Sequence, residues 1–212
     1  MNADSGSGVR KFWTPKDAEE ISPHLSKIVE WILESGRHLF IGLFGDESSA
    51  RTKLGSWLRR KDSEFSAFNA RLPMVHQSPV GILIALPGRA IPARRRADLL
   101  TLIKDTTPEG RPALKQHLEN ISRLTAPVEP AEYYVRTLTI DRQHRGRGIG
   151  KELLQQARVD AVSAGCNQLR LDVETTNDAA MKLYESVGFR RIATGTAPHL
   201  EIEMQSMVMP LS

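Results

Sequence analysis

The most constraining feature of this sequence is a glycine-rich segment, RQHRGRGIGKELL, at residues 142–154. The residues before it, YYVRTLTI at 133–140, are apolar and β-branched, which predicts a strand. After it, apolar residues recur at helical spacing: Leu153, Leu154, Ala157, Ala161 and Val162. The glycines therefore lie where a strand ends and a helix begins.

An open helix start beside closely spaced glycines is typical of an anion site. The glycines leave backbone amides uncovered, and a helix N-terminus carries unpaired N–H groups and about half a positive charge. Basic residues surround this one: Arg142, Arg145, Arg147 and Lys151. The pattern predicts a cradle for a phosphate group. The structural alternative is a turn that only joins strand to helix.

Two common glycine motifs do not fit this segment. A dinucleotide fingerprint starting at Gly146 would need a glycine where Lys151 stands, and a P-loop would need one where Arg145 stands. The segment instead contains the pattern R-x-x-G-x-G, formed by Arg145, Gly148 and Gly150. This pattern resembles the pyrophosphate loop of the GNAT acyl-coenzyme A N-acyltransferases.

A second stretch resembles the same family. Residues 177–189, NDAAMKLYESVGF, are similar to its motif N-x-x-A-x-x-L-Y-x-x-x-G-F, and the matching residues are Asn177, Ala180, Leu183, Tyr184, Gly188 and Phe189. The resemblance is strong over residues 133–189 and weaker over 46–86 and the last strand. It does not cover residues 88–131.

The resemblance implies an α/β fold with a central mixed, mostly antiparallel sheet and helices on both faces. It also implies a V-shaped splay between the two central strands. We expect residues 1–8 to be disordered and residues 9–212 to form a single domain. The uncovered residues 88–131 show two helical patterns, at about 93–104 and 113–124. We interpret them as a lid over the acceptor end of the cleft, or as a helical pair with solvated charged faces.

The earlier residues predict helices followed by a hairpin. Ser22 before Pro23 is typical of a helix start, Gly36 of a helix stop, and Asp46 of a helix cap. Residues 38–44 fit either a helical turn or a strand. Residues 65–77 and 80–86 predict two strands joined by a short turn.

The resemblance implies that the chain uses acetyl-coenzyme A. The residues expected to bind it are Leu138, Thr139, Ile140, Arg145, Gly146, Arg147, Gly148, Ile149, Gly150, Lys151, Asn177 and Tyr184. The amides of residues 145–151 would hold the pyrophosphate. The backbone of Leu138 and Ile140 would pair with the pantetheine arm, and Asn177 would contact that arm.

The implied reaction is direct transfer of an acetyl group to a primary amine of a small molecule or peptide in a ternary complex. Tyr184 would give the departing thiolate a proton or a hydrogen bond, unless it is only a tyrosine at the edge of the core. The backbone amide of Leu138 or a neighbour would stabilise the oxyanion. A base must keep the amine neutral, since a lysine-type amine has a pKa of about 10.4. The candidate bases are Glu132 and Glu174, and water is the alternative.

Arg136 is the candidate acceptor-binding residue because a charged side chain in the middle of a strand is unusual. It could bind a carboxylate on the acceptor, or it could pair with a neighbouring acid.

Composition narrows the remaining classes of function. The single cysteine, Cys166, excludes an internal disulfide and favours a reducing compartment, so we expect a cytoplasmic protein. The six histidines lack metal-ligand spacing, and we expect no metal. Arginines at 94–96 lack aromatic neighbours within 88–131, so we expect no nucleic-acid partner. We expect no membrane partner and leave open a homodimer. The second hypothesis of function is a non-catalytic acyl-coenzyme A sensor.

Overall fold

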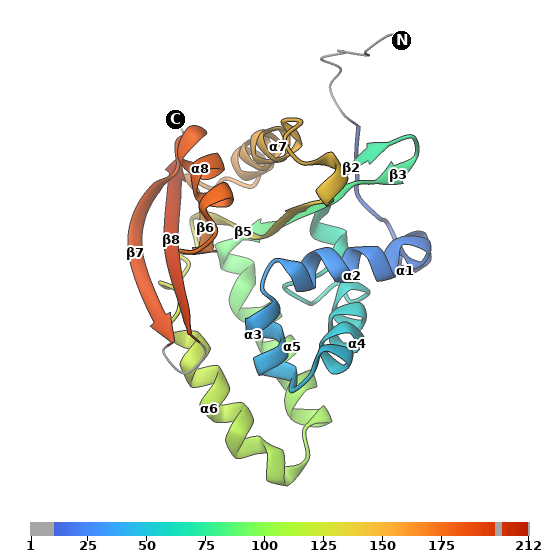
Figure 1. Ribbon diagram of the computed structural model, residues 1–212, viewed down its shortest axis with the longest axis vertical. Helices are drawn as coiled ribbons and strands as arrows, with labels where there is room; N and C mark the ends of the chain where they lie inside the picture. The colour runs from blue at the N-terminus through green and yellow to red at the C-terminus, as the bar shows by residue number, and fades with distance from the viewer. Residues whose placement is uncertain (1–10, 198–200, 212) are drawn as a thin grey trace.

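The computed structural model describes residues 11–197 and 201–211, which form one sheet with helices on both faces (Figure 1). Its strands are β1 (Phe12–Trp13), β2 (Ala70–Val75), β3 (Ser78–Pro79), β4 (Gly81–Pro87), β5 (Glu132–Ile140), β6 (Gln168–Glu174), β7 (Arg190–Ala197) and β8 (Ile202–Pro210). The order is β1-β2-β4-β5-β6-β8-β7, with β3 paired to β2. Among the described strands, only β5 and β6 pair in parallel. The predicted mixed, mostly antiparallel sheet is confirmed.

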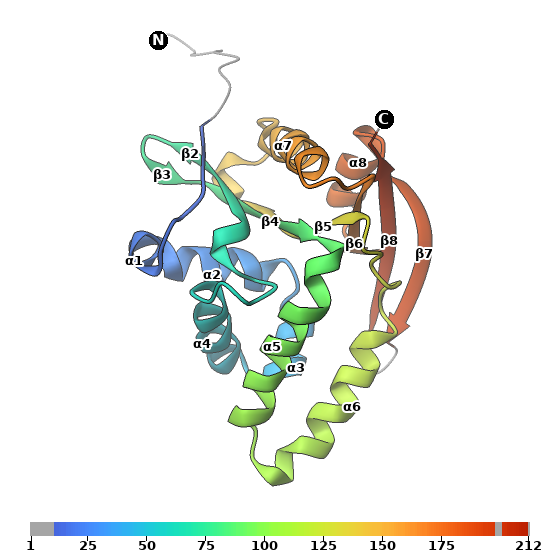
Figure 2. The ribbon, with the colours of Figure 1, turned by 180° about the vertical axis from the view of Figure 1, so that it is seen from behind.

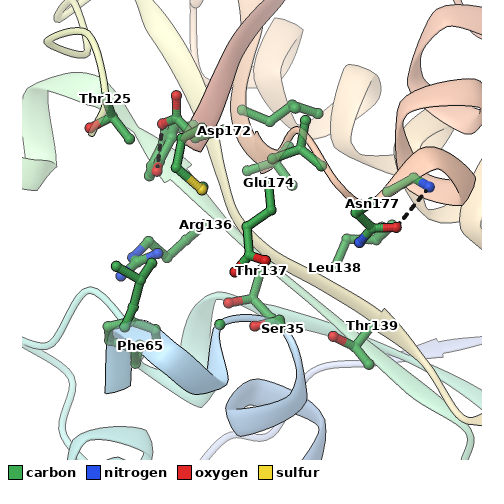
Figure 3. Close-up of a pocket in the computed structure, with 18 of the residues that line it drawn as sticks. Ser35, Phe65, Thr125, Arg136, Thr137, Leu138, Thr139, Asp172, Glu174 and Asn177 are labelled. Atoms are coloured by element: carbon green, nitrogen blue, oxygen red, sulfur yellow. Dashed lines mark hydrogen bonds between the residues drawn. The ribbon is translucent and has the colours of Figure 1, made fainter. Parts of the chain in front are cut away.

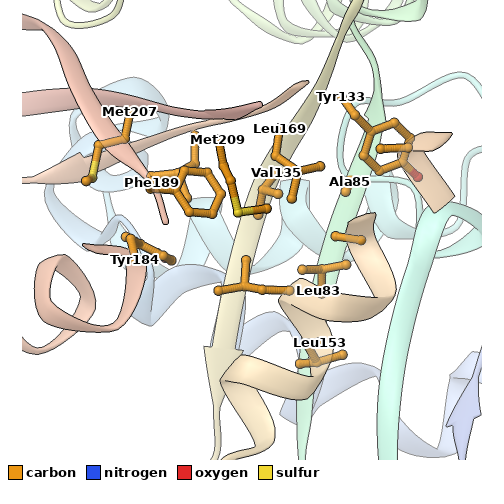
Figure 4. Packing of buried hydrophobic residues seen from close by; sticks show 14 of the residues in the cluster. Leu83, Ala85, Tyr133, Val135, Leu153, Leu169, Tyr184, Phe189, Met207 and Met209 are labelled. Carbon is orange, nitrogen blue, oxygen red and sulfur yellow. The ribbon is translucent and has the colours of Figure 1, made fainter. Parts of the chain in front are cut away.

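The helices divide between the two faces of the sheet (Figures 1 and 2). They are α1 (Ala18–Ile21), α2 (Leu25–Glu34), α3 (Arg37–Phe44), α4 (Glu47–Leu58), α5 (Ile91–Asp105), α6 (Arg111–Ser122), α7 (Ile149–Ser163) and α8 (Asp178–Ser186). Helices α7 and α8 cover one face around a core that Figure 4 shows, which includes Leu83, Val135, Leu153 and Phe189. Helices α2 to α4 cover the other face around a second core.

The two central strands separate after a short common run. They pair from Glu132 with Gln168 to Val135 with Leu171, whereas β5 continues to Ile140 and β6 to Glu174. The crossover between them is α7, as the strand–helix–strand pattern predicts. The predicted V-shaped splay is confirmed.

A β-bulge lies in β5 where the strands begin to separate. Ile84 of β4 faces Thr137, but the next residue, Ala85, faces Val135, so Arg136 is an extra residue. The bulge shifts the alternation of side chains. Tyr133 and Val135 before it, and Leu138 and Ile140 after it, all pack into the core under α7.

Two expectations for the chain before β4 need correction, those for Ser22 and for residues 65–77. Ser22 opens a 3₁₀ turn ahead of α2 and is not the N-cap of that helix. The predicted helix stop is observed, because α2 ends at Glu34 and Gly36 precedes the start of α3. The ambiguous residues 38–44 are helical, and Asp46 caps α4 as predicted by accepting a bond from the Ser49 amide at 2.8 Å. The strand predicted at 65–77 starts only at Ala70, because a 3₁₀ turn capped by Ser66 precedes it.

The other predicted elements agree with the structure. The helices predicted at about 93–104 and 113–124 are α5 and α6. Cys166 is buried. The expected disordered start at residues 1–8 lies outside the described residues.

A buried charge network fixes the point where β5 and β6 part. Arg170 of β6 is fully buried and contacts Asp172 Oδ1 at 2.8 Å, and its other terminal nitrogen donates to Ser206 Oγ of β8 at 2.7 Å. The Tyr134 hydroxyl of β5 donates to Asp172 Oδ2 at 3.0 Å. Arg170 also donates to the carbonyl oxygen of Ala126 at 3.2 Å. The network therefore ties β5, β6, β8 and the loop after α6 together.

Removing the cation of this network should strongly destabilise the fold. In Arg170→Ala the Asp172 carboxylate stays buried without its partner, so the free energy of unfolding should fall by about 3–5 kcal/mol. Urea denaturation at pH 7 measures this. The double variant Arg170→Met with Asp172→Leu should recover part of the loss, since both charges go together. Arg96→Ala, at an exposed position of α5, should change stability by less than about 0.5 kcal/mol. A loss equal to that of the control would contradict the role of the network.

Candidate active site

A cavity of about 1070 Å³ opens where β5 and β6 part (Figure 3). It is lined by β5, β6, the start of α7 and α8, and by residues of α3, α5 and α6. Most predicted site residues line it: Arg136, Leu138, Thr139, Ile140, Arg145, Gly146, Gly148, Ile149, Gly150, Lys151, Glu174, Asn177 and Tyr184. The predicted residues Glu132 and Arg147 do not.

The glycine-rich segment forms an open turn at one end of the cavity. Asp141 Oδ1 accepts a bond from the Gln143 amide at 3.1 Å and starts a 3₁₀ turn. Gly146 and Gly148 then have φ angles of 75° and 79°, a conformation that favours glycine. Gly148 is the N-cap of α7 and supplies no side-chain cap, so the first amides of the helix remain open to an anion.

Gly150 has a packing role that the motif did not reveal. A Cβ atom at this position would lie 3.0 Å from Leu183 Cδ2 of α8. The glycine therefore lets the first turn of α7 approach α8 closely. This contact places the open helix start beside the second motif.

The basic residues of the turn are held partly by an acidic residue from a distant part of the chain. Glu34, the last residue of α2, pairs with Arg145 at 3.0 Å and with Arg142 at 3.2 Å. Burial raises the pKa of Glu34, but hydrogen bonds from Arg145 and Arg142 and their positive charges outweigh it, so the pKa lies below its usual value. Because 111 residues separate Glu34 from Arg145, no local pattern could have indicated it.

The edge of β5 that faces the cavity has backbone groups that do not bond to β4. The Asp141 amide donates to the Val80 carbonyl at 2.9 Å. Asp141 and Val80 are therefore a hydrogen-bonded pair of the antiparallel ladder, in which bonded and non-bonded pairs alternate. Ile140 opposite Gly81, and Leu138 opposite Leu83, are consequently non-hydrogen-bonded pairs. Their backbone groups consequently point away from β4, toward the side that β6 has left. The Ile140 carbonyl already accepts a bond from Arg145 Nε at 2.9 Å.

The second motif forms α8 and its cap. Asn177 Oδ1 accepts a bond from the Ala180 amide at 3.1 Å, and Asn177 lines the cavity. The Tyr184 ring is buried and packs against Phe189 at 5.7 Å between ring centroids. Burial raises the pKa of Tyr184 to about 12, so its hydroxyl stays protonated at neutral pH.

The structure distinguishes the two candidate bases. The buried Glu132 carboxylate accepts bonds from the Glu129 amide at 2.8 Å and the Gln168 side chain at 2.7 Å, away from the cavity. These contacts hold the Glu132 carboxylate outside the cavity, and of the two candidate bases only Glu174 lines it. Glu174 lines the cavity, and Figure 3 shows its side chain reaching from β6 toward Thr137 of β5.

Arg136 lines the cavity without an acidic partner among the described residues. Its guanidinium lies over the Phe65 ring, 4.2 Å from the centroid. On the neighbouring strand β6, the Asp172 carboxylate already accepts hydrogen bonds from Arg170, Tyr134 and Ser206. Of the two alternatives left open by the sequence, pairing with a neighbouring acid is not observed.

Residues 88–131 contribute an apolar part of the cavity wall. Leu99 and Leu102 of α5 and Leu118 and Ile121 of α6 line it. Helix α5 follows β4 and α6 precedes β5 in the chain, and in Figure 2 the two helices extend away from the sheet.

The described residues contain no cluster of three or more His, Cys, Asp or Glu able to hold a metal ion. Within those residues, too, no helix combines the length and apolarity that crossing a bilayer requires.

Comparison with known proteins agrees with this geometry. Residues 113–189 match the family model described as the acetyltransferase (GNAT) family. An N-acetyltransferase from Staphylococcus aureus Mu50 has a similar fold, with a TM-score of 0.69 over 94% of this chain and all of that chain, at 17% identity. The fold is therefore that of the solved acetyltransferase structure, and the family match covers β5, the glycine-rich turn, α7, β6 and α8.

Two curated relatives are similar over part of the chain. The N-alpha-acetyltransferase RimI of Mycobacterium tuberculosis is 46% identical over 72 residues, which is 34% of this chain and 43% of the relative. The human N-alpha-acetyltransferase 30 is 40% identical over 58 residues, which is 27% of this chain and 16% of the relative. The chain thus spans less than half the length of either relative. Over residues 113–189, the chain is similar to the GNAT family of acetyltransferases.

Proposed function

We propose that this protein transfers the acetyl group of acetyl-coenzyme A to a primary amine of a small molecule or peptide by direct attack in a ternary complex. The observation that carries the proposal is the shared cavity. It joins an open helix start, the free edge of β5 and the Tyr184 side chain in one space. The names of the relatives, N-alpha-acetyltransferases, support an amine acceptor.

The cavity contains the backbone groups that such a cofactor needs. The amides of residues 145–151 bind the pyrophosphate, aided by the positive charge of Arg145 and Lys151. The backbone of Leu138 and Ile140 pairs with the pantetheine arm as a strand would, and Thr139 lies between them. Asn177 contacts the same arm from the start of α8.

The residues near the splay then divide the chemical work. Acetyl-coenzyme A, when bound, supplies the thioester carbonyl that the amine attacks. The Leu138 amide donates a hydrogen bond to the carbonyl oxygen as it gains negative charge. Glu174 accepts the proton of the amine, directly or through one water. Because the pKa of Tyr184 is about 12, its hydroxyl suits hydrogen-bond donation to the departing thiolate better than complete proton transfer.

Release of coenzyme A thiol in the presence of a panel of primary amines tests this function. Turnover with at least one amine, and formation of the acetylated product, are the expected results. If acetyl-coenzyme A raises the melting temperature but no amine yields product, the non-catalytic sensor is the correct function.

Gly148 should be required for cofactor binding. In Gly148→Val the side chain needs an unfavourable positive φ and stands beside the open amides, so coenzyme A affinity in calorimetric titration should fall at least about tenfold. Gly165→Val is a matched control. Gly165 also has a positive φ, 68°, and open space around its Cβ position, but it lies after the end of α7. Equal affinities in the two variants would contradict the cradle.

Removing the Tyr184 hydroxyl should lower turnover and leave the affinity for the cofactor nearly unchanged. Tyr184→Phe keeps the buried ring and loses the hydrogen bond to the thiolate, so kcat should fall by about 10- to 100-fold. The control is Tyr133→Phe, a tyrosine in the same core that does not line the cavity. Steady-state kinetics with acetyl-coenzyme A measure both. Unchanged turnover in Tyr184→Phe would remove the hydroxyl from the mechanism.

Glu174 is the base in this proposal. Glu174→Gln should lower kcat by about 10²-fold, the usual contribution of a positioned base. Glu109→Gln removes an exposed carboxylate that does not line the cavity, and it should retain full activity. A loss of less than about threefold in Glu174→Gln would assign the proton to water alone.

A homodimer and a cytoplasmic location remain predictions from the sequence. Among the described strands, β7 is an edge strand of the sheet, and a second copy of the chain could pair with its outer edge.

A further inference from the structure

Arg136 carries an uncompensated charge inside the cavity. No ion pair or hydrogen bond of its guanidinium is found among residues 11–197 and 201–211, and its only assigned contact is the face of Phe65. Stacking on an aromatic face leaves the in-plane N–H groups of a guanidinium available. A half-buried cation of this kind gains free energy when an anionic ligand pairs with it.

Three acids that line the cavity, Glu64, Asp98 and Asp172, have basic partners. Asp172 pairs with Arg170, as described above, at 2.8 Å. Glu64 pairs with Arg95 at 3.0 Å. Arg136 therefore has no counter-charge in these acids.

Asp98 follows the same rule. Its Oδ2 accepts bonds from the Ser63 hydroxyl and the Glu64 amide, each at 3.0 Å, and its Oδ1 lies 3.4 Å from Arg60. Burial raises its pKa to about 6, an effect that those hydrogen bonds only partly offset. Glu174 remains as the acid on the cavity wall with no assigned partner, on the opposite side of the splay from Arg136.

The cavity that contains Arg136 also has an apolar chamber. We call it the lid chamber and define it by Leu39, Leu43, Leu99, Leu118 and Ile121, which come from α3, α5 and α6 and line the same cavity. Each of these side chains is only partly buried, so an apolar group bound there would remove more apolar surface from water.

We propose that the acceptor is a small amine that carries both a carboxylate and a large apolar group, as a free apolar α-amino acid does. The inference rests on the proposed function and names the acceptor of that site. The carboxylate pairs with Arg136, the amine faces Glu174, and the apolar group enters the lid chamber. A peptide N-terminus is the weaker candidate, because a neutral amide stands where the free amino acid has its carboxylate.

Calorimetric titration of protein saturated with coenzyme A tests the proposal without requiring turnover. The ligands are L-phenylalanine, L-phenylalaninamide, phenethylamine and L-alanine. L-Phenylalanine should bind at least about tenfold more tightly than the amide and the decarboxylated amine, because only it forms the charge-assisted pair. L-Alanine should bind at least about tenfold more weakly than L-phenylalanine, because it leaves the chamber empty.

Variants of Arg136 separate the two contacts. Arg136→Gln should remove the preference for the carboxylate and keep phenethylamine affinity within about twofold of the wild type. Arg136→Lys should retain part of the preference, since it keeps the charge but loses the bidentate geometry. Arg96→Gln, at an exposed position of α5 outside the cavity, is the matched control and should behave as the wild type.

Three results would overturn the proposal: equal binding of the acid and its amide, a carboxylate preference that survives in Arg136→Gln, or no binding by any of the four ligands. Tighter binding of the amide would point to a peptide acceptor. The proposed function is judged separately by thiol release with the broad amine panel. Acetylation without a carboxylate preference refutes only the acceptor class, whereas carboxylate-dependent binding without any acetylation refutes only the enzyme.

Discussion

The separation of β5 from β6 is the constraint on which the site depends. Adjacent parallel strands normally satisfy each other's backbone groups, and here the pairing stops at Val135 and Leu171. The network of Tyr134, Asp172 and Arg170 lies at this point, and it joins the two strands by side chains where backbone pairing ends. Beyond it, the backbone of β5 is left for a ligand that can act as a strand.

In the proposed function, the same separation divides recognition between two kinds of groups. At the end near α7, binding would depend on backbone amides and on glycines that leave them uncovered, and side chains would add little specificity. At the end near α5 and α6, the wall consists of side chains from distant segments, such as Arg136 and Leu118. A cofactor shared by a family fits the first end, and an acceptor particular to one protein fits the second.

The parts that the sequence predicted well are local. The glycine-rich turn and the helix after Asn177 each depend on residues within about ten positions of one another, and both patterns are visible in the chain. The choice between Glu132 and Glu174 was not predictable in this way. Glu132 stands at the start of the paired region, whereas Glu174 lies beyond its last pair. Only the parallel register shows that Glu132 lies beside Gln168, away from the splay. Glu34 was missed for the same reason, since 111 residues of sequence separate it from Arg145.

One long-range feature did have a local signal. In residues 133–140 the apolar side chains alternate as Tyr133 and Val135, and then as Leu138 and Ile140, so the period of two slips by one residue at Arg136. If β5 had no bulge, its regular alternation would place the side chains of Thr137 and Thr139, and not those of Leu138 and Ile140, in the core under α7. The bulge absorbs the slip, and Thr139 instead donates to the Trp31 carbonyl of α2 at 3.0 Å. The alternation of apolar residues in β5 thus requires the bulge that places Arg136 beside the opening.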